Sequence, residues 1–191
     1  MQSCSLWREG EQFGWDTIKP HPEREPYLGY YDESKPEVSD WEIKWMAEHG
    51  ITFQQFCWFR NGGGDGNAIM PNVNSVALNE GYMNAKYSDK LKFSIMFENV
   101  NSGFTGIDDF KNNLVPYWIE YYFKDSRYMT IDNKPVLSFF NLQRLVDQMG
   151  GSNELVKQAM NYLSDECKKI GYDGIFTMAA AGVTNAQMLK E

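Results

Sequence analysis

Apolar residues recur every three to four positions in four stretches of the chain, which is the spacing of one face of an amphipathic helix. The first stretch begins after Pro36 and stops at Gly50, residues typical of a helix start and a helix end. The third contains Pro116, which we expect to kink that helix or to begin a new one. The spacing predicts helices over residues 37–49, 75–86, 107–124 and 153–170, and the start of another over 186–191.

The same spacing predicts which side chains of these helices are buried. In the first helix the apolar face is formed by Val38, Trp41, Trp45 and Met46. In the third helix it is formed by Ile107, Phe110, Leu114, Trp118 and Tyr121. In the fourth helix it is formed by Leu155, Ala159, Met160, Leu163 and Cys167.

Short apolar and aromatic runs lie between the helices and are typical of buried strands. They cover residues 51–59, 91–97, 135–140 and 172–178. A further short run at 128–131 meets a tight turn at 132–134. Strands that alternate with helices predict βαβ units and a parallel sheet.

The repeat favours a barrel over a doubly wound nucleotide-binding fold. No G-x-x-x-x-G-K-[ST] and no G-x-G-x-x-G pattern lies between a strand and a helix, and the glycine-rich run at 62–66 lacks the lysine of a phosphate loop. The strands begin roughly 40 residues apart, so eight units need roughly 320 residues, above the typical ~250. We therefore expect an α/β fold of the (β/α)8 TIM type, with residues 1–191 as one partial barrel that lacks a first strand and the last strands.

Composition excludes several classes of function. The chain carries 18 Lys and Arg against 26 Asp and Glu, a net charge of −8, without the basic stripe that nucleic acids or anionic membranes require. The 3 cysteines form no C-x-x-C pair and there are only 2 histidines, so we expect no metal and no cofactor. No signal peptide or membrane span is visible, and the localisation stays open. Aromatic residues make up 15% of the chain, a density found in cores and in sugar-binding clefts.

Three motifs in order resemble the glycoside hydrolase family 99-like domains, a family that includes proteins named as lipopolysaccharide O-antigen biosynthesis glycosyltransferases. The first is L-G-Y-Y-D at 28–32, followed by a helix and by F-C-W at 56–58. The others are F-E-N at 97–99 and R-Y-M-T-I-D-N-K-P-V at 127–136. Thr52 departs from the family pattern, which has aspartate there. The resemblance implies a barrel that acts on glycosidic bonds at the carboxyl ends of its strands.

The candidate substrate-binding residues lie where predicted strands end. Glu98 and Asn99 follow the second strand, and a carboxylate there can accept hydrogen bonds from sugar hydroxyls or move a proton. Trp58 can stack on a pyranose, and Arg60 can hold a hydroxyl or an anion. Asn141 ends the third strand. In the family-like loop, Tyr31 and Asp32 either contact ligand or organise the approach to the first helix.

The sequence is compatible with three functions. The resemblance implies part of a glycoside hydrolase, although the family's N-E-W-x-E-G-like stretch, which carries the working carboxylates, is absent from residues 1–191. For that reason Glu98 is only a weak catalytic candidate. The alternatives are a non-catalytic glycan-binding or assembly module and a glycosyltransferase-related protein. We expect a carbohydrate ligand, and self-association or pairing with the rest of a barrel through exposed sheet edges.

Overall fold

The computed structural model describes residues 14–60, 75–101 and 103–181. The chain divides into two compact units. The first comprises Met1–Gln54 and Asn72–Lys92, and the second comprises Gln55–Pro71 and Phe93–Glu191. Each unit is described by itself below.

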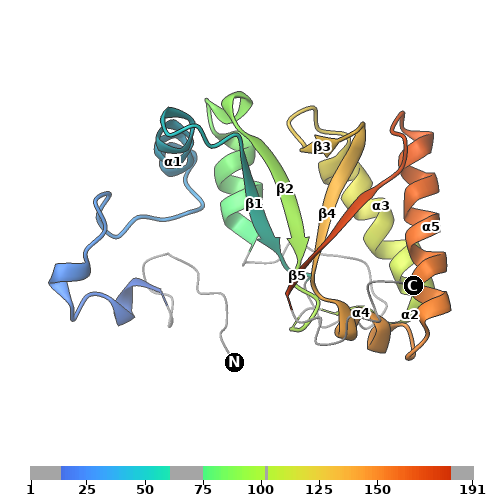
Figure 1. The fold of residues 1–191 in the computed structure, drawn as a ribbon. Coiled ribbons are helices and arrows are strands. Elements are labelled where there is room, and N and C mark those ends of the chain that lie inside the picture. Colours follow the sequence, from blue (N-terminus) through green and yellow to red (C-terminus); the bar gives the residue numbers. More distant parts are fainter. Residues whose placement is uncertain (1–13, 61–74, 102, 182–191) are drawn as a thin grey trace. The chain divides into compact units, whose positions relative to one another are not determined.

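Most of the sheet belongs to the second unit, and its strands are shown in Figure 1. Its neighbours run in the order β1, β2, β4, with β3 and β5 both paired to β4. β4 is parallel to β2 and β5, and β3 forms an antiparallel hairpin with β4. Two hydrogen bonds, Lys92 N–H to Thr52 O and Glu98 N–H to Trp58 O, have the same sequence offset, so β1 and β2 are parallel as well. The strands are β1 (Phe53–Trp58), β2 (Lys92–Phe97), β3 (Thr130–Ile131), β4 (Lys134–Asn141) and β5 (Phe176–Ala181).

The parallel strands β1, β2, β4 and β5 are neighbours in the order in which the chain makes them. A doubly wound nucleotide-binding sheet reverses its strand order at a switch point, whereas a (β/α) barrel places successive strands side by side. The predicted α/β class is therefore confirmed, and the strand order is that of part of a (β/α) barrel. The predicted tight turn is also present, because Asp132 and Asn133 both have positive φ, 48° and 52°, as a two-residue hairpin turn requires.

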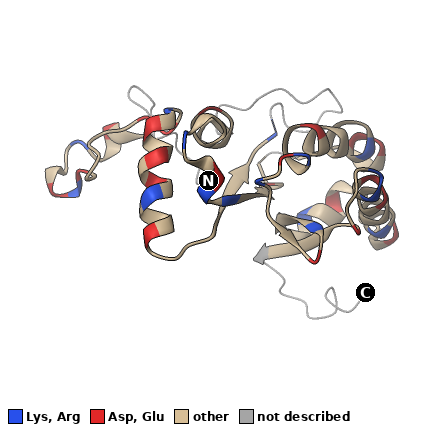
Figure 2. Cartoon of the chain, turned by 90° about the horizontal axis from the view of Figure 1, so that it is seen from above, with Lys and Arg blue, Asp and Glu red and all other residues tan. Residues whose placement is uncertain are grey.

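Among the described residues the helices follow the strands as predicted, with one addition, and the helix start predicted at 186–191 lies outside these residues. Helix α4 was not predicted, although Asn141 accepts a hydrogen bond from Arg144 N–H and so caps it. The strand predicted at 172–178 begins later in the chain than expected, because β5 covers Phe176–Ala181. In Figure 2, α1 is seen from the side and carries acidic residues around a single lysine, Lys44. The helices of the second unit are α2 (Gly106–Asp109), α3 (Val115–Trp118), α4 (Leu142–Gln148) and α5 (Asn153–Lys169).

The helical stretch around Pro116 changes period and thereby changes its buried face. π-helical turns cover Phe110–Leu114 and Ile119–Phe123, on either side of α3, where Pro116 lies near the helix start. A π turn adds a residue to the turn, so the inward positions fall further apart than in an α-helix. Phe110, Leu114 and Trp118 are buried as predicted, but Tyr122 and Phe123 are buried in place of Tyr121, which is 61% exposed. The prediction for Tyr121 was wrong for this reason.

The core of the second unit is largely aromatic. Trp58, Phe97, Phe110 and Trp118 are fully or almost fully buried, and their ring centroids lie 5.5–5.8 Å apart in consecutive tilted or edge-on pairs. Such geometry adds to the free energy gained from burying the rings. The rings join β1 and β2 to the helical stretch that follows β2, so this one cluster fixes which face of the sheet the helices cover.

The first unit is organised around α1. Ser39 and Ile43 form its buried face, and Gly81 lies against it so closely that a Cβ there would come within 2.8 Å of Ser39 Oγ. The small residues at this contact decide the packing, and Trp41 is consequently 48% exposed. The prediction was therefore wrong for Trp41, whereas Val38, Trp45 and Met46 are half-buried. The elements of this unit are 3-10 turns at Trp15–Thr17, Pro22–Arg24, Tyr82–Asn84 and Ser88–Lys90, α1 (Pro36–Glu48) and a π turn at Ala77–Gly81.

The altered helix period gives a direct test. We expect Tyr122→Ala to lower the free energy of unfolding by about 3–5 kcal/mol, because it removes a buried ring and the partner of the Trp58 indole. Tyr121→Ala, the matched control one residue away, should cost less than about 1 kcal/mol. Chemical denaturation of both variants measures this, and a larger loss for Tyr121→Ala would contradict the π-turn register.

Candidate functional site

The carboxyl ends of β1, β2 and β4 meet at one edge of the sheet, as expected for parallel strands. Glu98 and Asn99 follow β2, Arg60 lies just beyond β1, and Asn141 is the last residue of β4. In (β/α) barrels this edge holds the functional residues. Five of the seven residues singled out from the sequence therefore belong to this edge, namely Trp58, Arg60, Glu98, Asn99 and Asn141.

Glu98 supports the loop that follows β2. Its side chain is buried, with 5% of the residue exposed. One carboxylate oxygen accepts a hydrogen bond from Val100 N–H (3.3 Å) and the other accepts one from Asn101 N–H (3.0 Å). Both carboxylate oxygens thus accept hydrogen bonds from backbone N–H groups, and Glu98 thereby stabilises the loop that follows β2.

Asn99 and Asn141 form a reciprocal bridge between two strand ends. The Asn99 amide donates from Nδ2 to Asn141 O (2.8 Å) and accepts at Oδ1 from Asn141 N–H (3.0 Å). The side chain thereby makes the pair of hydrogen bonds that a neighbouring strand would make. Asn99 O accepts from Gln148 Nε2 (2.9 Å), which ties the bridge to α4. Both asparagines are framework residues of this edge.

Arg60 forms a buried, bidentate ion pair with Asp109. Its Nη1 and Nη2 lie 2.6 Å and 2.9 Å from the two carboxylate oxygens, and both side chains are almost fully buried. Asp109 also accepts from Thr105 N–H and Asn113 Nδ2. Burial raises the pKa of Asp109, but hydrogen bonds from Arg60, Asn113 and Thr105 outweigh it, so the net pKa lies below its ordinary value. The pair joins the end of β1 to α2.

Trp58 lies in the aromatic core on the helix side of the sheet. It is 1% exposed, and its indole N–H donates to Tyr122 Oη (2.9 Å). A ring in this position has no open face on which a pyranose can stack. Its predicted role in sugar binding therefore has no geometric support in the described structure.

Tyr31 and Asp32 belong to the first unit. Asp32 Oδ1 accepts from Ser34 N–H (2.9 Å) and Ser34 Oγ (2.7 Å), so it organises the turn before α1. The half-buried Tyr31 ring packs edge-on against Trp15 with centroids 4.9 Å apart. Burial raises the pKa of Tyr31, and the nearby Glu42 and Glu33 raise it further.

The sheet has a second face, opposite the helices, whose residues the sequence did not single out. Side chains alternate between faces along a strand, so Phe97 and Phe139 lie on the helix side while Ser138 and Phe140 lie on the other. Gln55 shares this face, because its Nε2 donates to Ser138 Oγ (2.8 Å). Alternating polar positions within the strands were the available signal, but single polar residues in apolar runs do not reveal which face they occupy.

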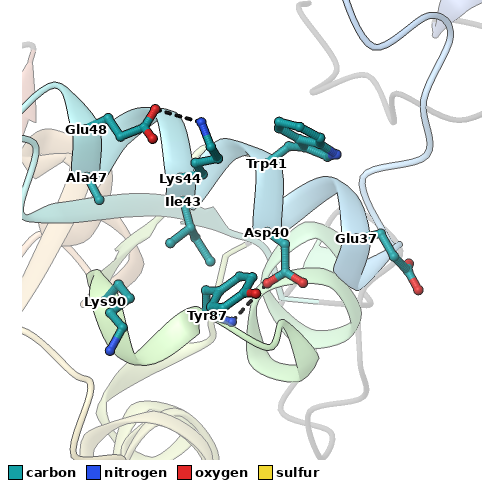
Figure 3. A pocket seen from close by; sticks show the side chains of 9 residues that line it. All are labelled: Glu37, Asp40, Trp41, Ile43, Lys44, Ala47, Glu48, Tyr87 and Lys90. Atoms are coloured by element: carbon teal, nitrogen blue, oxygen red, sulfur yellow. Dashed lines mark hydrogen bonds and ion pairs between the residues drawn. The ribbon is translucent and has the colours of Figure 1, made fainter.

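A groove of about 620 Å³ runs along α1 in the first unit (Figure 3). Ile43 and Tyr87 lie at its centre, and Tyr87 N–H donates to Asp40. Lys44 at the rim is paired with Glu48 (2.8 Å). The groove is largely apolar, and its charged rim residues Asp40, Lys44 and Glu48 are already paired.

A second hollow, of about 530 Å³, lies beside α4 and α5 and includes Leu145, Met160 and Thr177. Neither hollow contains any of the residues singled out from the sequence. Among the described residues, no His, Cys, Asp and Glu side chains gather in a group that could bind a metal ion. No helix in the described ranges has both the length and the apolar character to cross a bilayer.

Comparison with known proteins gives only distant structural similarity. No family model and no curated protein matches the chain. Two solved structures of the GH99 endo-alpha-mannosidase from Bacteroides thetaiotaomicron resemble it, one of them a complex with bis-tris propane. The identities are 16% and 17% and the TM-scores 0.43 and 0.42, over 61% of this chain. The alignments span 30% and 32% of those chains, about a third of their length.

The buried ion pair makes stability depend on pH. Because the pKa of Asp109 is lowered in the folded chain, its carboxylate stabilises the fold above its ordinary range, and that contribution is lost as the pH falls through the folded pKa. We expect Asp109→Asn to cost about 3–5 kcal/mol near pH 7, since it leaves Arg60 buried without its charge partner. Relative to wild type, the deficit should shrink below about pH 4. Urea denaturation across pH measures it, with the exposed Asp165→Asn as control. A deficit independent of pH would contradict the assignment.

Proposed function

We propose that this chain is part of a carbohydrate-active (β/α) barrel protein and contributes a wall of its sugar-binding cleft. One structural observation carries the proposal: four parallel strands are neighbours in chain order, and a polar framework of Glu98, Asn99 and Asn141 joins the carboxyl ends of β2 and β4. The three ordered sequence motifs support the same class, and two of them end at or beside this edge.

In this proposal the framework residues position the cleft and do not carry out the chemistry. Glu98 uses both carboxylate oxygens for backbone N–H groups, so we assign it a positioning role. Hydrolysis of a glycosidic bond by the usual mechanism needs two carboxyl groups that flank the bond. The chain's part in such a reaction is therefore to bind and orient the sugar, and glycoside hydrolysis belongs to the barrel as a whole.

Contacts with the sugar come from the open face, opposite the helices. Phe140 lies there, close to the end of β4, and is 39% exposed. An aromatic ring presents a flat apolar surface that matches the apolar face of a pyranose. Phe140 thus takes the stacking role that the sequence suggested for Trp58.

A second candidate function is an assembly module. Within the described residues, β1 pairs only with β2, and β5 pairs only with β4, so each has an open edge. Self-association through these edges would place the chain in a larger sheet without any affinity for sugar. A chain that forms a stable dimer in light scattering and binds no oligosaccharide favours this function over the first.

The stacking role of Phe140 can be tested on the 191-residue chain. We expect calorimetric titration with neutral gluco-, manno- and galacto-configured tetrasaccharides to detect binding of at least one of them. Phe140→Ala should weaken that binding about tenfold, equivalent to about 1.4 kcal/mol, through loss of the ring surface. Tyr121→Ala, an exposed aromatic on the helix, is the matched control and should bind as wild type. Equal affinity of all three proteins, or no binding by wild type, would contradict the proposal.

A further inference from the structure

The outer face of α1 carries an exposed indole. Trp41 lies midway in sequence between Ser39 and Ile43, the buried residues of this helix, and two residues turn an α-helix by about 200°. The Trp41 side chain therefore projects from the side opposite the buried face, which accounts for its exposure. The helices of a (β/α) barrel form its outer ring and face solvent on that side, so completion of the barrel would not cover Trp41.

Further aromatic rings lie close to Trp41. Trp45 is its neighbour on the helix, with ring centroids 5.8 Å apart, and the 93% exposed Tyr27 packs against Trp45 at 6.1 Å. In the groove of Figure 3, Tyr87 is 45% exposed. Single exposed rings are common, but contiguous rings beside a groove mark a binding surface. Tryptophan and tyrosine are also the residues on which protein interfaces most often depend.

The rim of this groove is acidic. Its α1 side supplies three carboxylates and one ammonium group, those of Glu37, Asp40, Glu48 and Lys44. On the other side, Lys90 is paired with the neighbouring Asp89 (2.8 Å). The ion pair between Lys44 and Glu48 is exposed, and such pairs are weak enough for a carboxylate to exchange its partner. The charge of the rim therefore complements a basic partner.

Glu48 contributes little to the stability of α1. It lies in the last turn, where the helix dipole favours a cation, and the helix has no basic residue there. It also follows Lys44 by four positions, which is the weaker order for an ion pair along a helix. A role in binding accounts for a carboxylate at this position.

We propose that the groove along α1 docks a basic amphipathic helix of a partner protein. The α1 residues that line it extend from Glu37 to Glu48, roughly 16 Å or three turns, which matches a short helical segment. Apolar side chains of the partner helix enter the groove beside Trp41 and Tyr87, and its basic side chains pair with the carboxylates of the rim. The inference adds a partner to the chain and does not depend on the binding of sugar.

Fluorescence anisotropy with a labelled model peptide tests the inference on the 191-residue chain. The probe is an amphipathic peptide of leucine and lysine, about 18 residues long so that it forms a helix on its own, and its counterpart has glutamate in place of lysine. We expect the lysine peptide to bind and the glutamate peptide not to bind. Trp41→Ala should weaken binding about tenfold, whereas Tyr121→Ala, which removes an exposed ring outside the groove, should bind as wild type.

Reversal of the charge at Glu48 separates binding from folding. Glu48→Lys should weaken binding of the lysine peptide about tenfold. It should change the melting temperature little, because a cation at the end of the helix offsets the lost pair with Lys44. Glu120→Lys is the matched control, since Glu120 forms an exposed pair with Lys124 four positions away (2.6 Å) and its reversal changes the net charge equally. This control should bind as wild type.

Three results would overturn the inference. The first is that neither peptide binds. The second is that both peptides bind equally, or that Glu120→Lys weakens binding as much as Glu48→Lys, because the attraction is then general to an acidic chain. The third is that the neutral tetrasaccharides, and not the lysine peptide, shift the Trp41 indole resonance in ¹H–¹⁵N NMR, because the groove is then a sugar site. None of these results changes the prediction for Phe140→Ala.

Discussion

The parallel register of β1, β2 and β4 is the constraint on which the second unit depends. It places Phe97 and Phe139 on the side of the helices and Gln55, Ser138 and Phe140 on the other side. A shift of one residue in any strand would exchange the two faces, exposing the aromatic residues and burying the polar ones. The aromatic cluster between sheet and helices opposes such a shift, because Trp58, Phe97 and Trp118 pack on one another at 5.5–5.7 Å. The core and the candidate site are thus two consequences of one register.

The carboxyl edge and the open face have different tasks. At the edge, the polar groups of Glu98, Asn99 and Asn141 bond to backbone groups of neighbouring segments. Arg60 and Asp109 join the end of β1 to α2 with a buried ion pair. These bonds hold the strand ends in place, which is what precise binding requires of its supporting residues. The open face carries two exposed side chains, those of Gln55 and Phe140, and the Gln55 amide is bonded to Ser138 Oγ.

The order of strands and helices could be predicted from the sequence because it depends on local patterns: apolar spacing, glycine stops and a tight turn at Asp132 and Asn133. The side of the sheet or helix on which each side chain lies could not be predicted. Trp58 ends a strand in which the two polar residues, Gln54 and Gln55, are adjacent, so polar and apolar positions do not alternate and gave no sign that the Trp58 ring points to the helices. The α-helical period predicted that Tyr121 is buried, but because of the π turns Tyr122 is buried instead. The partner of Arg60 lies 49 positions away, and only the fold brings Asp109 to it.

Phe140, close to the end of β4, is the side chain to which sugar stacking is assigned, and this assignment is the central claim. Two-dimensional ¹H–¹⁵N NMR of the backbone amides tests it directly, because Phe140 and Tyr121 are both exposed aromatic residues and only Phe140 lies on the open face. On titration with the neutral tetrasaccharides, the amide resonance of Phe140 should shift strongly, while that of Tyr121 should shift little. A sugar that shifts only residues of the α1 groove, or leaves the Phe140 amide resonance unmoved at saturation, would contradict the claim.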